Sequence, residues 1–212
     1  MTTPKGASWP NFKRALVAIL RGVKPDEIDG IADALAESGF EAIEIPLNSP
    51  DPFHSISQTA KRLGSQCLIG AGTVLTPDDV DRLADAGGRL LVSPNVNTTV
   101  LAQAHRHGMV TMPGVFSPTE ALTAIHAGAS ALKFFPASVL GPGGVSAIRA
   151  VLPPDITVGV VGGVSDKSFK DYAAVGVRTF GLGSSLYKPG DTAAAVKAKA
   201  ETAITSYDAA FS

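Results

Sequence analysis

The residue in this sequence that is best suited to take part in a chemical reaction is Lys133. It lies in residues 131–135, a short apolar run with the composition of a β-strand that is buried on both faces. Burial disfavours the charged ammonium and lowers the pKa of a lysine, which leaves a free amine that can attack a carbonyl carbon and form a Schiff base. A lysine near a strand end can also extend its ammonium to water, so the run by itself leaves both interpretations open.

Two more charged residues occupy comparable places in other apolar runs. Glu44 stands between Ile43 and Ile45, and Arg21 directly follows Leu20. A carboxylate close to a neutral amine can transfer the protons that Schiff-base chemistry requires. Outside such chemistry, the glutamate would serve as the buried ion-pair partner of a cation, and the arginine would form a salt bridge at the surface.

A regular alternation of short apolar runs and amphipathic segments must position these side chains. Eight runs are predicted strands: 16–20, 41–46, 67–71, 90–93, 109–112, 131–135, 157–161 and 179–182. Eight helical segments follow them: 26–38, 52–63, 77–86, 98–107, 118–127, 142–151, 168–175 and 192–211. Eight strands that are each followed by a helix predict an α/β fold of the closed (β/α)8 TIM-barrel type, with an open doubly wound sheet as the alternative. An extra N-terminal helix is expected over residues 8–14, where it would cover the bottom of the barrel.

The composition predicts one globular domain over residues 1–212, with 45% hydrophobic and 17% charged residues. The formal net charge is −1 and no basic block is present, so nucleic acid is not an expected partner. The sequence lacks a signal-peptide core and a membrane-length apolar run, which predicts a cytoplasmic protein with no membrane partner. Cys67, the only cysteine, is expected to be a buried structural thiol. The four histidines lack metal-ligand spacing, and no dinucleotide-binding fingerprint is present, so neither a metal nor another cofactor is predicted.

The ends of the predicted strands carry most of the unusual residues. In a (β/α)8 barrel the active site lies in the loops after the strands, so the lysine, the glutamate and the arginine are predicted to converge there. The loops after the seventh and eighth strands contain Gly162, Gly163, Gly183 and Ser184. Loops at these two positions bind phosphate in many barrels, because backbone N–H groups can approach the phosphoryl oxygens closely. Two ordinary glycine turns are the alternative interpretation.

Five segments between Val17 and Tyr187 together match a known pattern. They are Ala18-Ile19-Leu20-Arg21-Gly22, Ala42-Ile43-Glu44-Ile45-Pro46-Leu47-Asn48-Ser49-Pro50, Ile69-Gly70-Ala71-Gly72-Thr73-Val74-Leu75, Ala131-Leu132-Lys133-Phe134-Phe135-Pro136 and Val161-Gly162-Gly163-Val164. The chain resembles the class I aldolases that act on 2-keto-3-deoxy-6-phosphogluconate and its galactonate epimer. This resemblance implies a (β/α)8 barrel, a homotrimer and a reaction that uses no metal.

The resemblance also implies roles for individual residues. Lys133 would be the Schiff-base lysine and Glu44 the general acid/base. Contacts with the substrate would come from Arg21 and Thr73 at its pyruvate end and from Pro94 and Phe135, which would line the pocket. The phosphate cradle would consist of Gly162, Gly163, Gly183 and Ser184. The expected partners are small molecules: a phosphorylated sugar acid, pyruvate and glyceraldehyde 3-phosphate.

Two departures from the gluconate-type pattern bear on the substrate. That branch usually carries Leu-Arg-Thr after the catalytic glutamate, where this chain has Leu47-Asn48-Ser49. It also usually has threonine before the paired glycines, where this chain has Val161. A threonine hydroxyl can hydrogen-bond one configuration of the substrate C4 hydroxyl, whereas valine cannot. Both departures resemble the galactonate-specific branch, which makes 2-dehydro-3-deoxy-6-phospho-D-galactonate the expected substrate.

Three alternatives remain at this point. The first is an aldolase of the same family that acts on the gluconate epimer or on 4-hydroxy-2-oxoglutarate. The second is a phosphate-binding barrel enzyme such as a sugar-phosphate isomerase or epimerase, which needs no buried lysine. The third is a non-catalytic barrel that binds a sugar phosphate, which does not require a potential nucleophile beside a base.

Overall fold

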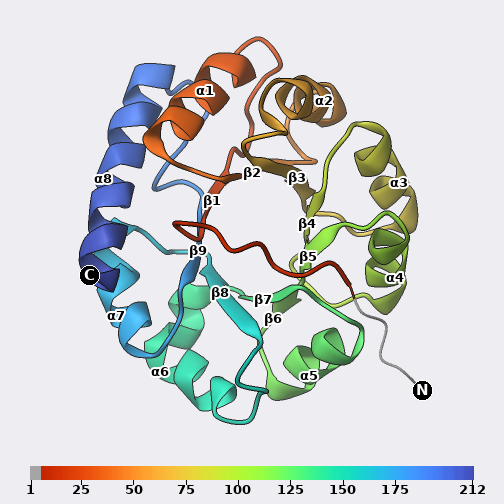
Figure 1. Cartoon of the computed structure of the whole chain (residues 1–212), viewed down its shortest axis with the longest axis vertical. Helices are drawn as coiled ribbons and strands as arrows, with labels where there is room; N and C mark the ends of the chain where they lie inside the picture. Colours follow the sequence, from red (N-terminus) through yellow and green to blue (C-terminus); the bar gives the residue numbers. More distant parts are fainter. Residues whose placement is uncertain (1–5) are drawn as a thin grey trace.

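A ring of parallel β-strands surrounded by α-helices makes up the protein (Figure 1), and this computed structural model describes residues 6–212. The described residues contain nine strands: β1 (Leu16–Ile19), β2 (Ala42–Pro46), β3 (Leu68–Gly72), β4 (Leu90–Val92), β5 (Val110–Met112), β6 (Gly114–Val115), β7 (Ala131–Phe134), β8 (Thr157–Val161) and β9 (Thr179–Leu182). They also contain eight α-helices: α1 (Ile28–Ser38), α2 (Pro52–Leu63), α3 (Pro77–Asp85), α4 (Thr98–Arg106), α5 (Pro118–His126), α6 (Ala137–Arg149), α7 (Phe169–Ala174) and α8 (Ala193–Phe211). A short 3-10 helix, Asp166–Ser168, precedes α7.

The nine strands correspond to the eight predicted ones, because the fifth is divided at Pro113. The order of pairing is β5-β4-β3-β2-β1-β9-β8-β7-β6, and every pair is parallel. Pro113 has no N–H to donate to a ladder, and it stands between β5, which pairs with β4, and β6, which pairs with β7. Its carbonyl accepts a hydrogen bond from the Lys133 N–H at 2.9 Å, which joins the two ends of the ring. The predicted (β/α)8 barrel is therefore confirmed.

Helix α6 begins earlier than predicted. The sequence pattern predicts a helix over 142–151, whereas the structure has one over Ala137–Arg149 with a break at Gly141. Gly141 has φ 62° and ψ 172°, a conformation that glycine adopts readily and that no helix contains. The regular part of α6 thus starts at Pro142, as predicted, and the preceding turn is an addition directly after β7.

The predicted N-terminal helix over residues 8–14 is wrong. These residues form no helix in the structure. The backbone N–H groups of Lys13 and Arg14 donate to Glu41 Oε2, at 2.7 and 3.3 Å, and not to carbonyls of an N-terminal helix. Pro10 also biases the residue before it away from the helical region. A distant carboxylate thus satisfies donors that the sequence pattern assigns to a helix.

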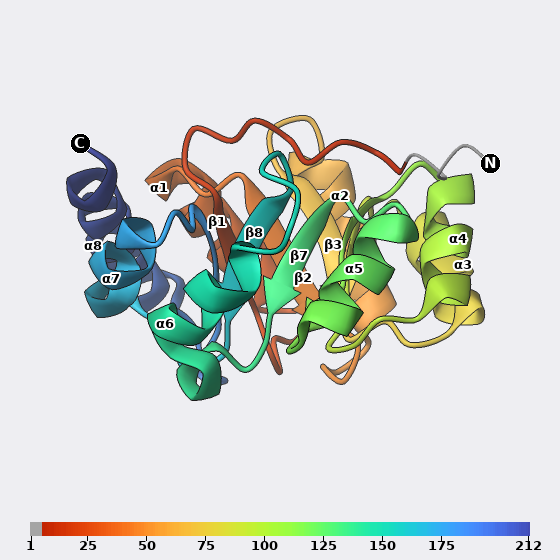
Figure 2. The ribbon, with the colours of Figure 1, turned by 90° about the horizontal axis from the view of Figure 1, so that it is seen from below.

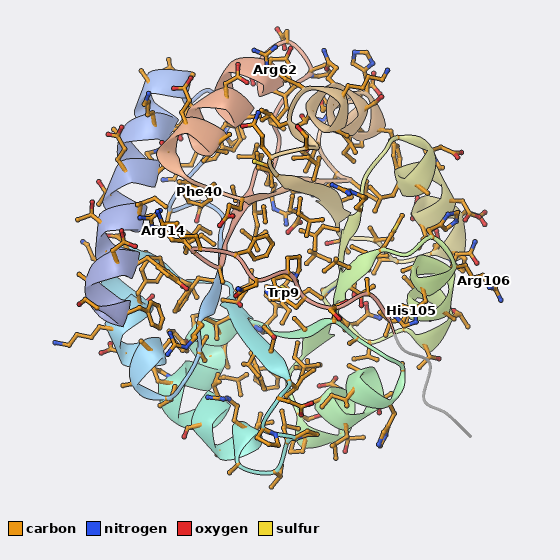
Figure 3. The ribbon with its side chains drawn as sticks, in the orientation of Figure 1. Trp9, Arg14, Phe40, Arg62, His105 and Arg106 are labelled. Carbon is orange, nitrogen blue, oxygen red and sulfur yellow. The ribbon has the colours of Figure 1, made fainter. Side chains whose placement is uncertain are left out.

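The N-terminal segment nevertheless covers the bottom of the barrel, as expected. It crosses the end of the ring from which the strands start, opposite their arrowheads (Figures 1 and 2). Trp9 lies over the centre of the ring in Figure 3 and contacts Phe12 edge to face, with ring centroids 5.7 Å apart. Both rings pack against a cluster inside the barrel that consists of Val17, Ala42, Leu90, Val92, Val110, Met112 and Ala131. The bottom of the barrel is therefore closed by apolar side chains.

A larger apolar core fills the space between the strands and the surrounding helices. Its largest fully buried side chains are the phenylalanines Phe40, Phe134, Phe169 and Phe180. The rings of Phe169 on α7 and Phe180 on β9 lie 4.5 Å apart. This core holds the helices in place and leaves the carboxyl ends of the strands for the site. Among the described helices, none has the length and apolar composition needed to cross a lipid bilayer.

Candidate active site

Lys133 points into the barrel. Ala131, two residues earlier on β7, belongs to the apolar cluster inside the ring, and side chains two apart on a strand share a face. The neighbours of Lys133 in register are Gly114 on β6 and Gly159 on β8. Because neither glycine has a side chain, other residues pack closely beside the lysine: Pro94 against Gly114, and Met112 against Gly159. Its side chain is only 7% exposed, and Nζ lies 4.8 Å from the centroid of the Phe135 ring.

Glu44 also points into the barrel, from β2. Ala42 on the same face of the strand packs in the inner cluster, and Glu44 itself is 3% exposed. Its carboxyl group lies directly against the backbone of β3: a Cβ added at Gly72 would be 2.7 Å from Glu44 Cδ. Glu44 Oε2 has no hydrogen-bond partner within residues 6–212. The absence of a side chain at Gly72 leaves space for the Glu44 carboxyl group, and Glu44 Oε2 remains free to accept or hold a proton.

The pKa values of both groups are shifted in the direction that favours the uncharged form. Burial lowers the pKa of Lys133, which nearby Arg21 lowers further, while the negative charge of Glu44 acts in the opposite direction. Burial raises the pKa of Glu44 against the opposing effects of Lys133 and Arg21. The salt bridges within residues 6–212 include no contact between Lys133 and Glu44 at 4.0 Å or less. A buried amine and a buried carboxyl group thus lie in the same interior with no ion pair between them.

Arg21 is held at the mouth of the barrel by the loop after β2. Its Nη1 donates to Asn48 Oδ1 at 2.8 Å, and the N–H of Gly22 donates to Ser49 Oγ at 2.9 Å. These two bonds connect the loops that follow β1 and β2. From the sequence, Asn48 is only a mark of one family branch. Its pairing with Arg21 is not predictable there, because the two residues are 27 apart in sequence.

A cavity of about 370 Å³ opens at the carboxyl ends of the strands. Neither Lys133 nor Glu44 lines it, but Phe135, whose ring centroid is 4.8 Å from Lys133 Nζ, does. The cavity is lined by Ile19, Arg21, Gly22, Phe135, Val161, Gly162, Gly163, Val164, Gly181, Gly183, Ser184, Tyr187, Lys188 and Pro189. Seven of the predicted site residues are in this set: Arg21, Phe135, Val161, Gly162, Gly163, Gly183 and Ser184. The size is that of a site for a small organic ligand.

The other predicted residues lie next to Lys133 and Glu44 and do not line this cavity. Thr73 directly follows Gly72, whose backbone the Glu44 carboxyl group touches. Pro94 packs against Gly114, the neighbour of Lys133 in register: a Cβ at Gly114 would be 2.8 Å from Pro94 Cα. The structure thus places both at the inner end of the site, beside the lysine and the glutamate.

The opposite end of the cavity is built from backbone. Gly162 and Gly163 have φ values of 92° and 76°, which glycine adopts without strain. Within residues 6–212, no protein acceptor takes the N–H groups of Gly163 and Ser184. Unpaired backbone donors from two adjacent loops are suited to an anionic ligand.

Seven cavity residues are not among the predicted site residues. Four of them, Ile19, Gly22, Val164 and Gly181, lie within two residues of a predicted one; the other three are Tyr187, Lys188 and Pro189. These three lie on the loop between Ser184 and α8, and the only signal for them is that they follow the glycine-bearing end of β9. Tyr187 is 2% exposed, its hydroxyl has no partner in the described chain, and burial raises its pKa to about 12. Within residues 6–212, the His, Cys, Asp and Glu side chains form no group of three or more that could hold a metal ion.

The fold and the site together define a (β/α)8-barrel enzyme of the aldolase class. The family model described as KDPG and KHG aldolase matches residues 12–202, and the chain belongs to this family. A probable 2-dehydro-3-deoxy-6-phosphogalactonate aldolase of Rhizobium meliloti is 62% identical over 202 residues, which cover 95% of each chain. The 2-dehydro-3-deoxy-6-phosphogalactonate aldolase of Escherichia coli K12 is 44% identical over 92% of this chain and 95% of its own. A solved structure described as native KDPGal superposes with a TM-score of 0.94 at 43% identity, covering 96% of this chain and 98% of that one.

Proposed function

We propose that this protein is a Schiff-base aldolase that cleaves 2-dehydro-3-deoxy-6-phospho-D-galactonate to pyruvate and D-glyceraldehyde 3-phosphate. The observation that carries the proposal is a buried lysine that points into the barrel close to a buried glutamate. The relatives named as galactonate-type aldolases at 62% and 44% identity support the substrate.

Lys133 supplies the nucleophile in this proposal. Its neutral amine attacks the C2 ketone, and loss of water from the carbinolamine leaves a protonated Schiff base. The C3–C4 bond then breaks, and its electron pair moves toward the imine nitrogen to give an enamine. Burial favours this sequence because it keeps the amine free of a proton before attack.

Glu44 moves the protons. It removes the C4 hydroxyl proton, directly or through one water, as C3–C4 cleaves, and the leaving fragment becomes the aldehyde of glyceraldehyde 3-phosphate. The enamine carbon is then protonated, and hydrolysis of the Schiff base releases pyruvate and restores the lysine. Burial raises the pKa of Glu44, which suits its carboxyl group both to take up a proton and to return it.

The remaining residues orient the substrate between these groups. Arg21 and Thr73 bind the pyruvate end, and Pro94 and Phe135 shape the pocket around it. The phosphate is held by backbone and side-chain groups of Gly162, Gly163, Gly183 and Ser184. Binding at this far end helps to align the scissile bond with the reacting groups.

Val161 is the residue that we connect with the choice of epimer. It is 8% exposed and lines the cavity, and its side chain packs against Gly181 on β9, where an added Cβ would be 2.7 Å from Val161 Cγ2. A valine offers no hydrogen bond to the C4 hydroxyl, so neither configuration gains a partner there. Family members named as gluconate-type aldolases share about a third of their residues with this chain, for example 32% with that of Treponema pallidum.

Trapping with borohydride tests the lysine. Wild-type protein incubated with pyruvate and borohydride is expected to gain one covalent adduct by mass spectrometry. Lys133→Met keeps the volume of the side chain but has no amine, and it is expected to gain none. An adduct of unchanged yield in Lys133→Met would show that another amine carries the chemistry.

A coupled assay of pyruvate release tests the substrate. Wild-type protein is compared on the two epimeric phosphorylated acids at equal concentration, and we expect the larger kcat/KM on the galactonate epimer. A larger value on the gluconate epimer would assign the protein to the alternative activity of its family.

We also propose a homotrimer acting in the cytoplasm. The family resemblance supports the trimer, and exposed apolar side chains at Leu75, after β3, and Phe116, after β6, offer surface for self-association at the carboxyl ends of the strands. A single buried cysteine suits a reducing compartment. Light scattering coupled to size-exclusion chromatography gives the oligomeric state directly, and a monomeric mass would contradict the trimer.

A further inference from the structure

The cavity carries two full positive charges among the residues that the structure describes. Arg21 and Lys188 are the only charged residues in its lining, and they come from the loops after β1 and β9. We propose that Lys188 recognises the charge of the substrate phosphate and sets the preference of the enzyme for phosphorylated over unphosphorylated sugar acids. This inference rests on the function proposed above.

Arg21 is committed to the other end of the cavity. Its guanidinium donates to Asn48 on the loop after β2. It also lies near enough to Lys133 and Glu44 to affect the charge of both. A cation in this position neutralises the carboxylate at the pyruvate end of a substrate. The phosphate, at the far end of the same molecule, needs a different counter-charge.

The backbone around Lys188 is fixed at the mouth of the cavity. Tyr187, directly before it, is 2% exposed. Pro189, directly after it, packs on the positive-φ backbone of Gly22, where an added Cβ would be 2.8 Å from the proline Cγ. The Lys188 N–H donates to Asp191 Oδ2 at 2.8 Å. The lysine stem therefore starts from one defined place beside the paired loops.

The ammonium of Lys188 forms no ion pair within the described residues, although its charge contributes to the lowered pKa of Asp191. The salt bridges of residues 6–212 do not include it. The nearest acidic neighbour in sequence, Asp191, directs its Oδ2 to the ammonium of Lys199 at 2.6 Å and to the backbone of Lys188. The hydrogen bond from Lys199 is the largest cause that lowers the pKa of Asp191, and the backbone N–H of Lys188 comes next. The charge of the aspartate thus serves to anchor the loop.

The chemistry of a phosphate explains why such a cation matters. The backbone N–H groups of Gly163 and Ser184 present partial positive charges, which bind any small acceptor group at this position. A phosphoryl group carries nearly two negative charges at neutral pH. A full positive charge attracts the phosphoryl group much more strongly than the uncharged hydroxyl of an unphosphorylated sugar acid. The backbone amides discriminate less between these two groups, because they can donate hydrogen bonds to either. Lys188 is the lining residue that adds this distinction.

The test compares two substrates with three variants. Steady-state pyruvate release is measured on 2-dehydro-3-deoxy-6-phospho-D-galactonate and on its unphosphorylated counterpart. Lys188→Gln removes the charge, Lys188→Arg keeps it, and Lys61→Gln removes an equal charge from the exposed end of α2, away from the site. We expect Lys188→Gln to raise KM for the phosphorylated acid by about two- to fivefold with little change in kcat, as for an exposed charge pair that contributes to binding alone.

The controls separate charge recognition from a structural role. Lys188→Gln is expected to leave the unphosphorylated acid unaffected, Lys188→Arg to restore the wild-type KM, and Lys61→Gln to change neither substrate. The difference between wild type and Lys188→Gln should shrink as ionic strength rises, because screening shortens the reach of the charge from about 30 Å at 0.01 M to about 3 Å at 1 M.

Two results would overturn the inference. If wild type turns over the phosphorylated acid and Lys188→Gln has the same KM, or if both substrates weaken equally, Lys188 does not recognise the phosphate charge. If wild type releases pyruvate from neither epimer, the proposed function fails first, and this inference fails with it.

Discussion

Gly72 offers the sharpest test of the catalytic arrangement, through the substitution Gly72→Ala. The added methyl group would be 2.7 Å from Glu44 Cδ and 3.2 Å from Val92 Cβ. Ordinary carbon–carbon contact is at about 3.5–4.0 Å, so the Glu44 carboxyl group must retreat by about 1 Å. The contact with Val92 needs only a few tenths of an ångström. The substitution therefore displaces the proposed proton carrier and leaves Lys133 without a new contact.

A displacement of this size has a known scale of effect. Misplacing a reacting group by 1 Å can cost about 100-fold in rate. We expect Gly72→Ala to lower kcat for pyruvate release by about that factor. Borohydride trapping of pyruvate on Lys133 should remain at wild-type yield after long incubation, because the amine is untouched.

Gly143→Ala is the matched control. Gly143 lies in α6, and nothing lies within 4 Å of a Cβ added there. Gly143→Ala therefore measures the general effect of replacing glycine by alanine in the absence of a clash. Its kcat should equal that of wild type. A Gly72→Ala enzyme that folds and keeps kcat within twofold of wild type would refute the role of Glu44, and parallel loss of trapping would show that the methyl group acts on Lys133.

Three further predictions concern charge, stability and reactivity. The carboxylate of Glu44 raises the pKa of Lys133 and the charge of Arg21 lowers it, so the acid limb of the trapping rate at saturating pyruvate should move to lower pH in Glu44→Gln and to higher pH in Arg21→Gln. Shifts of both variants in one direction would contradict this electrostatic account. Trp9→Ala removes an apolar ring from the bottom of the barrel and should lower the free energy of unfolding by about 2 kcal/mol, which calorimetry would show as a fall in Tm of about 4–8 °C. The value of kcat should not change, because the site lies at the other end of the barrel. Ser8→Ala is the control, and a loss of kcat in Trp9→Ala would contradict the separation of the two ends. Burial raises the pKa of the Cys67 thiol to about 11, so a thiol-specific disulfide reagent at pH 8 should label the denatured protein at once and the native protein only slowly; rapid labelling of the native protein would show that the thiol is accessible.

The barrel and most site residues are predictable because they depend on local pattern. Alternating apolar runs and amphipathic segments indicate the eight units, and polar residues at strand ends indicate the site. The direction of Lys133 is not predictable in this way, because alternation on a strand leaves either face possible. The packing of Ala131 inside the ring decides it.

The errors and omissions come from interactions between distant residues. The predicted helix over 8–14 fails because the carboxylate of Glu41 takes the backbone donors. The pairing of Arg21 with Asn48 joins two loops that only the closed barrel brings together. Lys188 was overlooked because a lysine on an exposed loop has no local signal that separates it from other surface cations.

The N-terminal segment over the bottom of the barrel has a practical consequence. The last turn of α8 lies at the same end of the molecule as this segment, opposite the arrowheads of the strands (Figure 2). An affinity tag or a carrier protein fused after α8 would therefore extend away from the cavity. Attached to a solid support through such a fusion, the enzyme would keep its mouth facing the flowing solution, which suits its use in an immobilised reactor.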